Sequence, residues 1–207
     1  MAIIHRATLS PTKLDLLTEY LPNVAALAPF ATNLEPVGAY RFDDPAGDVG
    51  IETHILTNAD GVLLQVPLTY RSQPVDGAKA ALLGTMEHSV LGKRWVYNAC
   101  GEAVYVIALA ETIGSGGAGA REMVETPDGP IERAPSVTVR GSGASSAAVS
   151  SGAVEVTSVG SDTHMTIGDI TVVLRQVLDA GESPAGSRQL EGNWAAIDTP
   201  VVLASLS

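Results

Sequence analysis

Hydrophobic and polar residues alternate along several runs of this chain, a pattern typical of β-strands that bury one face. In the run "VGIETHIL", the apolar or β-branched residues Val49, Ile51, Thr53 and Ile55 fall on one side. The run "VLLQVPLTY" follows the hairpin signal Asp60-Gly61 and is expected to be the partner strand. Because proline cannot donate to a strand ladder, Pro67 predicts an edge strand or a bulge in this second run.

Two other stretches have a helical period. Residues 11–21 are expected to form a helix, because Ser10 followed by Pro11 is a helix start signal and Pro22 ends the pattern. Its leucines share one face at helical spacing: Leu14, Leu17 and Leu21. The run "EAVYVIALAETIG" is long for a strand and has apolar residues near helical spacing, so it also predicts a helix. Residues 75–84 predict a short helix or a turn.

The composition changes after the second helical stretch, where Gly and Pro become frequent and periodicity disappears. Residues 114–134 therefore predict a Gly/Pro-rich linker or long loop between two subdomains, 1–113 and 135–207. Alternation returns beyond it, and "MTIGDITVVLRQVL" predicts a strand pair around Gly168-Asp169. The expected fold is α+β, mainly antiparallel sheet, with a β-rich second subdomain.

Composition and charge narrow the function classes. The 207 residues carry a formal net charge of −11, which disfavours binding to nucleic acid and to anionic membranes. Cys100 is the one cysteine, so no disulfide within the chain is expected. The first residues lack the pattern of a secretory signal, and the chain has no apolar run of membrane-spanning length. A cytoplasmic location is the resulting expectation.

The spacing of the reactive residues gives little support for a metal site or for a catalytic nucleophile. Glu52 and His54 share a strand face and could together bind a metal, but a solvated polar face is the simpler reading, since two groups leave a tetrahedral site half empty. Cys100 and His88 could form a thiolate pair, although Cys100 is more simply a small hydrophobe at a strand end. No catalytic residue, metal site or cofactor is therefore expected.

Two glycine-rich segments resemble parts of phosphate-binding loops. They are "GSGGAG" at 114–119 and "RGSGAS" at 140–145, and neither completes a known phosphate-loop motif. The first is expected to belong to the linker.

The stretch "LLGTMEHSVLGKRWVYNACG", residues 82–101, mixes charged and aromatic residues between glycines. This composition suits a surface that binds a sugar, another small ligand or a protein. Its candidate ligand-binding residues are His88, Arg94, Trp95 and Tyr97. The alternative is a solvated hairpin whose Trp95 or Tyr97 turns into the core. A further alternative is an enzyme centred on Glu52, His54 and His88, which requires these three side chains to share a cleft.

The segments "HRATLSPTKLDLLTEYLP", "GAYRFDDPAGDVGIE" and "VPLTYRSQPVDGAKAALLGTMEHSVLGKRWVYNA" together resemble the N-terminal cap domain of actinobacterial maltokinases, and more closely the stand-alone maltokinase N-terminal cap-like proteins. The resemblance covers about residues 3–110. It implies a cystatin-like cap, a curved antiparallel sheet over the helix 11–21. The implied strands are 37–43, 48–56, 62–70 and 93–99.

Residues 135–207 faintly resemble the intermediate subdomain of these kinases, which carries a Gly-containing hairpin over the nucleotide and a phosphate-contacting lysine. Along that lysine strand the resemblance puts Val173 at the lysine position, with Arg175 two residues on. It also implies that the chain stops where the catalytic lobe would begin. Because phosphoryl transfer needs a metal-binding acid, a base-like aspartate and a cation, no kinase activity is expected.

The resulting expectation is a non-catalytic accessory or regulatory protein that acts through protein contacts. A link to sugar or glycogen metabolism is implied by the resemblance alone. The expected partner is a protein that the sequence does not identify, and homo-oligomerisation stays open. The alternative function is binding of a small ligand or carbohydrate by the 86–97 surface.

Overall fold

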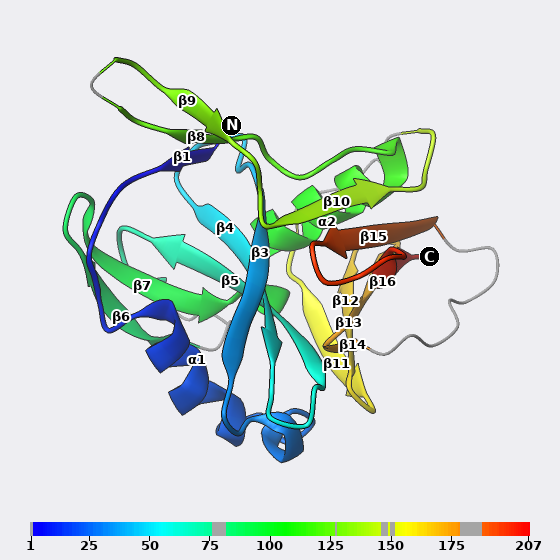
Figure 1. The fold of residues 1–207 in the computed structure, drawn as a ribbon. Helices are drawn as coiled ribbons and strands as arrows, with labels where there is room; N and C mark the ends of the chain where they lie inside the picture. Colours follow the sequence, from blue (N-terminus) through cyan, green and yellow to red (C-terminus); the bar gives the residue numbers. More distant parts are fainter. Residues whose placement is uncertain (1, 76–81, 127, 146–148, 150–151, 179–187) are drawn as a thin grey trace.

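The computed structural model describes residues 2–75, 82–126, 128–145, 149, 152–178 and 188–207. These residues form three sheets, almost entirely antiparallel, with two α-helices and three short 3-10 turns among them (Figure 1). The expected α+β class with mainly antiparallel sheet is confirmed. No helix in the described ranges is long and apolar enough to cross a bilayer.

The first half of the chain builds a seven-stranded sheet around which the molecule is organised (Figure 1). Its strand order is β2-β6-β7-β5-β4-β3, and β14 from the second half pairs with β5. The strands are β2 (Leu9–Ser10), β3 (Glu35–Phe42), β4 (Gly50–Thr57), β5 (Leu63–Arg71), β6 (Leu82–His88), β7 (Gly92–Asn98) and β14 (Val177–Leu178).

The second half builds a six-stranded sheet of order β10-β15-β16-β13-β12-β11. Its strands are β10 (Val137–Gly141), β11 (Glu155–Val159), β12 (Asp162–Ile167), β13 (Ile170–Arg175), β15 (Arg188–Trp194) and β16 (Val201–Leu206). A third, small sheet joins the start of the chain to its middle, because β1 (Ala2–Ile4) pairs in parallel with β8 (Glu122–Val124), which pairs with β9 (Ile131–Arg133).

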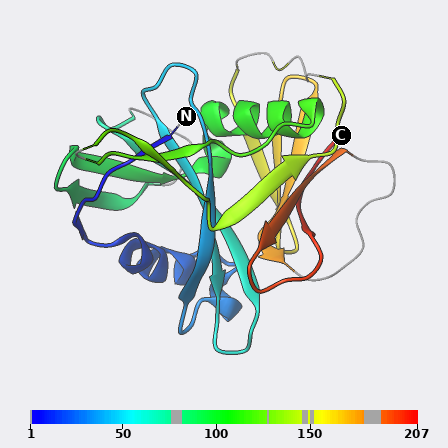
Figure 2. The ribbon, with the colours of Figure 1, turned by 45° about the horizontal axis from the view of Figure 1, so that its top comes forward.

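Helices cover the two faces of the seven-stranded sheet (Figure 2). One face packs against α1 (Lys13–Tyr20) and the turns η1 (Leu21–Asn23) and η2 (Ala28–Phe30). The other face shares a single apolar core with η3 (Ala99–Gly101), α2 (Ala103–Ser115) and the six-stranded sheet. The two halves of the chain therefore form separate sheets over a common core.

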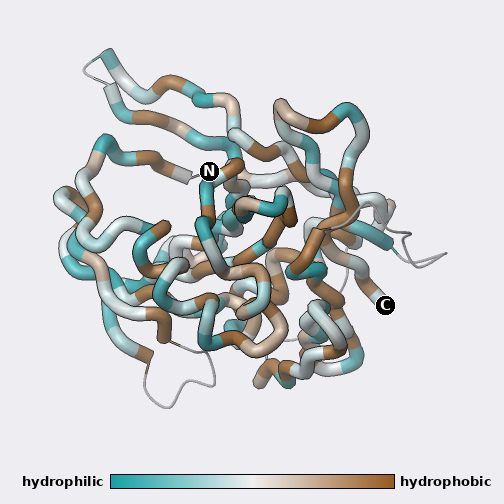
Figure 3. Tube along the Cα trace, turned by 60° about the horizontal axis from the view of Figure 1, so that its bottom comes forward, coloured by the Kyte–Doolittle hydropathy of each residue, from teal (hydrophilic) through white to brown (hydrophobic). Residues whose placement is uncertain are grey.

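The alternating pattern places residues on the faces that the sequence indicates, and the alternation can be followed along the chain in Figure 3. Ile51, Thr53 and Ile55 of β4 are buried on the face toward α2. Leu17 and Leu21 are buried against the opposite face, as the helical spacing predicts. The hairpin at Asp60-Gly61 and the strand pair around Gly168-Asp169 are both present.

The start of α1 differs from the expectation. Its N-cap is Thr12, whose Oγ1 accepts the Asp15 N–H at 3.2 Å while Asp15 Oδ2 accepts the Thr12 N–H at 2.8 Å. This reciprocal capping box satisfies two backbone donors, whereas a cap at Ser10 would satisfy only one. The helix consequently begins at Lys13 instead of residue 11.

Pro67 lies in an interior strand and not at an edge, because β5 sits between β4 and β7. The missing N–H donor of Pro67 breaks no strand-pairing hydrogen bond at this position, and the strand geometry explains why. The Gln65 N–H bonds Gln176 O on the β14 side of β5, and Pro67 presents its backbone to the same side two residues later. At that point β14 has ended, and the β7 pairing begins only at Leu68.

Three other expectations need correction or fall outside the described residues. The segment 114–134 is more than a linker, since it contains β8 and β9 and buries Glu122. Strand β6 was missing from the implied sheet. The helix or turn expected over 75–84 lies largely in residues 76–81, outside the described ranges, and residues 82–84 belong to β6.

The two glycine-rich segments pack against one another and cap α2. The N–H groups of Gly143 and Ser145 donate to Ile113 O and Gly114 O at 2.9 and 3.0 Å, and the Gly141 N–H donates to Gly117 O at 2.8 Å. A Cβ on Gly143 would lie 2.0 Å from Gly114 O. These donors therefore satisfy helix carbonyls, which would otherwise be orphaned, and are not free for phosphate.

This close approach predicts a large effect of a single methyl group. Gly143→Ala should lower the free energy of unfolding by about 2 kcal/mol or more, because backbone atoms on both sides must move. Gly152→Ala is the matched control, since its Cβ would meet only Ile167 Cγ1 at 3.8 Å. Urea unfolding of both variants measures the difference, and equal stabilities would contradict the packing described.

Candidate functional site

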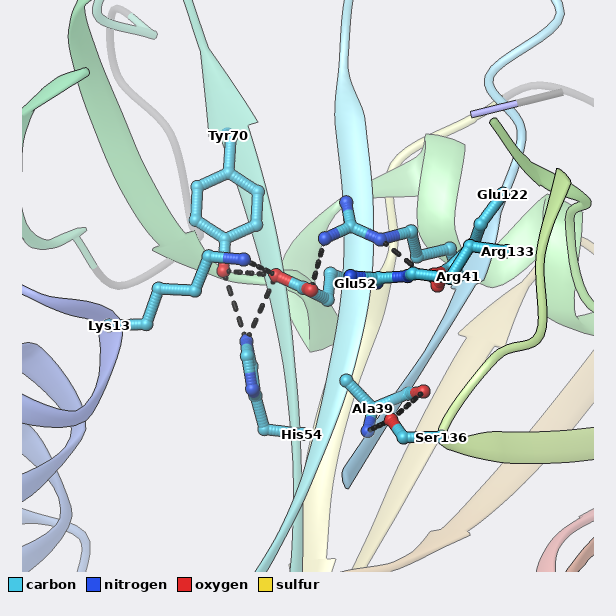
Figure 4. Close-up of polar contacts among 9 residues, drawn as sticks. All are labelled: Lys13, Ala39, Arg41, Glu52, His54, Tyr70, Glu122, Arg133 and Ser136. Carbon is cyan, nitrogen blue, oxygen red and sulfur yellow. Dashed lines mark hydrogen bonds and ion pairs between the residues drawn. The ribbon is translucent and has the colours of Figure 1, made fainter. Parts of the chain in front are cut away.

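A buried carboxylate, Glu52, is the centre of a polar cluster in the seven-stranded sheet (Figure 4). Its side chain lies on the α1 face of β4 and is 4% exposed. Lys13 Nζ and Arg41 Nη2 donate to separate carboxylate oxygens, and the Tyr70 hydroxyl donates to Oε2 at 2.9 Å. His54 Nε2 lies 3.1 Å from both Oε2 and the Tyr70 oxygen.

Strand register explains why these groups meet. Arg41 of β3 is directly opposite Glu52, and Tyr70 of β5 is opposite Gly50, so both side chains fall on the face that carries Glu52 and His54. Lys13 reaches the same carboxylate from the first turn of α1. The expectation that Glu52 and His54 lie on a solvated strand face is therefore wrong, because α1 and the neighbouring strands cover them.

The cluster continues beyond the sheet. Arg41 Nε lies 3.4 Å from Glu122 Oε1 without satisfying hydrogen-bond geometry, and Arg133 Nε donates to Glu122 Oε2 at 3.0 Å (Figure 4). Glu122 is buried on β8 and Arg133 is on β9. Alternating charges thus connect α1, the seven-stranded sheet and the small β1-β8-β9 sheet.

Electrostatics keep Glu52 ionised despite its burial. Loss of solvent alone would raise the pKa of its carboxyl, but His54, Arg41 and Lys13 outweigh that effect and hold the pKa well below 4.5. Burial, and then the charge of Glu52, raise the pKa of Tyr70. Burial also lowers the pKa of Lys13, and Glu52 opposes that shift. At neutral pH the centre therefore consists of a carboxylate with a neutral phenol donating to it.

The candidate triad of Glu52, His54 and His88 is only partly assembled. Glu52 and His54 are in contact, but His88 lies at the end of β6, where its Nδ1 accepts the N–H groups of Val90 and Leu91 at 3.2 and 3.1 Å. His88 therefore orders the β6–β7 turn. Within the described ranges, no group of three or more His, Cys, Asp or Glu side chains is arranged to hold a metal ion.

The four candidate ligand residues divide between the two faces of the β6–β7 hairpin. His88 and Arg94 lie on the α1 face, and both line a cavity of about 470 Å³. Trp95 and Tyr97 lie on the opposite face, where Lys93 Nζ sits 5.2 Å above the Trp95 ring. Tyr97 is buried, and its oxygen accepts the Val75 N–H at 2.9 Å. The structure thus assembles two of these residues and separates the other two from them.

The other residues that the sequence analysis considered have surroundings typical of residues with a structural role. Cys100 is buried in η3, where burial raises the pKa of its thiol to about 12, consistent with a small hydrophobe. Val173 and Arg175 share a face of β13 opposite the buried Val172 and Leu174. Neither residue faces the common core.

Sequence reasoning did not identify Lys13, Arg41, Tyr70 or Glu122 as parts of one cluster. The sequence held a signal for Arg41, because pairing β3 with β4 as a hairpin in the observed register places Arg41 opposite Glu52. No local signal could have found Lys13, which is 39 residues from Glu52 and arrives through helix packing.

Removing the central charge should destabilise the fold. Glu52→Gln leaves Lys13 and Arg41 with an uncompensated buried charge, so the free energy of unfolding should fall by about 3 kcal/mol. Glu132→Gln is the matched control, since that carboxylate pairs with Arg121 on an exposed surface and its loss should change little. A Glu52→Gln variant as stable as the unchanged protein in urea would contradict the role described.

The same carboxylate predicts a pH dependence. Because the pKa of Glu52 is lower in the folded than in the unfolded chain, its contribution is complete above about pH 4.5 and is lost as the pH falls toward the folded value. Stability measured from about pH 6 down to about pH 3 should therefore decline less steeply in Glu52→Gln than in the unchanged protein. Parallel declines in the two proteins would show that Glu52 does not carry this dependence.

Comparison with known proteins gives one family match. A comparison with protein families matches residues 27–101 to the maltokinase N-terminal cap domain, a name that links the match to an enzyme of sugar metabolism. The matched range runs from just before η2 to the end of η3 and contains Arg41, Glu52, His54 and Tyr70. A search of curated proteins found no match. Residues 27–101 of this chain are therefore similar to the maltokinase N-terminal cap domain.

Proposed function

We propose that this protein is a non-catalytic accessory or regulatory protein that acts through protein contacts in sugar or glycogen metabolism. The observation that carries the proposal is the closed arrangement around Glu52. Lys13, Arg41, His54 and Tyr70 all direct polar atoms at this one carboxylate, so the groups best suited to catalysis are used to hold α1 to the sheet. The metabolic assignment comes from the cap-domain match.

An exposed sheet edge supports the part of the proposal that concerns protein contacts. Strand β11 is the last strand of the six-stranded sheet, and every residue in it is exposed. Val156 and Val159 are 42% and 64% exposed on this strand. An open edge strand with apolar side chains can pair with an extended segment of another protein, which supplies both backbone hydrogen bonds and side-chain contacts.

The experiment is affinity capture from the native host, followed by measurement with the purified partner. We expect the unchanged protein to retain an enzyme that acts on maltose, glucose polymers or sugar phosphates. Val156→Lys should weaken that binding at least tenfold, because edge lysines oppose strand pairing. Ile131→Lys is the matched control, with a similarly exposed apolar residue on β9.

Two results would contradict the proposal. One is equal weakening by both lysine variants, which would remove β11 as the contact. The other is turnover of ATP and maltose by the purified chain that is lost in Tyr70→Phe while the fold is retained, because a catalytic group would then lie in the Glu52 cluster.

A further inference from the structure

The cavity of about 470 Å³ lies between the N-terminal segment and the α1 face of the seven-stranded sheet. The N-terminal segment runs from β1, paired with β8, to β2, paired with β6, and so passes over the part of the sheet that α1 leaves open (Figure 1). The loop between β3 and β4 and the β6–β7 turn also line the cavity. A volume of this size suits a small molecule.

Cationic side chains gather on the sheet side of this cavity. Lys13, Arg41 and Arg94 all line it, whereas the chain as a whole has a net charge of −11. Glu52 and Glu122 offset Lys13 and Arg41. Arg94 has no carboxylate partner among the described residues: its Nη2 donates to Leu91 O at 2.7 Å, and its Nε has no hydrogen-bond partner there. The guanidinium group therefore keeps unused donors beside the cavity.

The N-terminal segment and the hairpin turn contribute apolar side chains to the cavity. Ile3, Leu9 and Leu91 line the cavity from the N-terminal segment and the hairpin turn, and Ile3 and Leu91 are 49% and 45% exposed. Next to the cationic side chains, these apolar residues provide a surface for the apolar part of an amphiphilic molecule.

Among the described residues that line the cavity, the acidic ones are Asp43, Asp44 and Asp48, all on the β3–β4 loop side. The Asp44 carboxylate accepts the N–H groups of Ala46, Asp48 and Val49, so it serves to shape this loop. Its negative charge nevertheless repels an anion at that end. An anionic headgroup is therefore directed toward Arg94, and an apolar body toward Leu91 and Ile3.

We propose that this cavity binds a small organic anion, with one carboxylate or phosphate group at Arg94 and an apolar body against the N-terminal segment. This site requires no protein partner, so it goes beyond the accessory role. It also differs from the 86–97 surface expected from the sequence, because it uses Arg94 without Trp95 or Tyr97.

The test measures binding of octanoate, octyl phosphate, octan-1-ol and octylammonium to the full chain by isothermal titration calorimetry. Both anions should bind at least tenfold more tightly than the alcohol or the amine, which share the apolar body and lack the negative charge. The tighter of the two anions identifies the headgroup as carboxylate or phosphate.

Variants on adjacent residues of β7 provide the control. Arg94→Met should weaken octanoate binding at least tenfold, and Arg94→Lys should restore part of it. Lys93→Met removes a charge from the opposite face of the same strand and should leave binding unchanged. Thermal unfolding of each variant verifies that it is folded.

Four outcomes would overturn the proposal. Three are the absence of binding of both anions, equal binding of the anions and octan-1-ol, and equal weakening of anion binding by Arg94→Met and Lys93→Met. A tighter octylammonium complex would also overturn it, and would assign the cavity to a cation at the β3–β4 loop instead.

Discussion

The ionised Glu52 side chain is the interaction on which the arrangement of the cap depends. An ion buried in a protein is costly unless its charge and its hydrogen-bonding capacity are both matched. Here the match comes from four residues on three strands and a helix, so the carboxylate is stable only when these elements have their native positions. Because burying the Glu52 charge is costly in any other arrangement, the cluster favours one position of α1 on the sheet.

The contact between the glycine-rich segments has the same role at the other face of the sheet. The C-terminal carbonyls of α2 find their donors in the loop at 141–145, which belongs to the second half of the chain. Residues lacking a Cβ allow the two backbones to approach closely enough for these bonds. A polar cluster on one side of the sheet and a backbone contact on the other thus hold the layers together, while the apolar core fills the space between α2 and the two sheets.

Local patterns predicted those features that depend on local physics. The faces of β4, the buried leucines of α1 and the helical state of residues 103–115 follow from the spacing of apolar residues. The capping box at Thr12 was also readable, since Asp15 follows it at the required distance. Strand β6 was harder to predict from the sequence. Gly84 interrupts the alternation of its residues, and the register between β6 and β7 shifts between Leu82 and Gly84.

The candidate site could be predicted only in part, because its members come together through tertiary packing. Glu52 and His54 attracted attention as neighbours on a strand, but their burial depends on Lys13 and on the closure of the sheet by β3 and β5. Trp95 and Arg94 looked alike in the sequence as binding residues. Their adjacent positions on a strand send them to opposite faces, and the cavity described above lies on the face of Arg94.

The pairing of β14 with β5 has a consequence for how the molecule can be divided. Two residues from the second half, Val177 and Leu178, complete the edge of β5 within the range that matches the cap family. Cutting the chain after residue 101 would remove these hydrogen bonds from β5, and it would also remove α2 and the six-stranded sheet that share the core with the matched segment. The boundary of the family match therefore runs through the apolar core of this chain and not between two separately packed units.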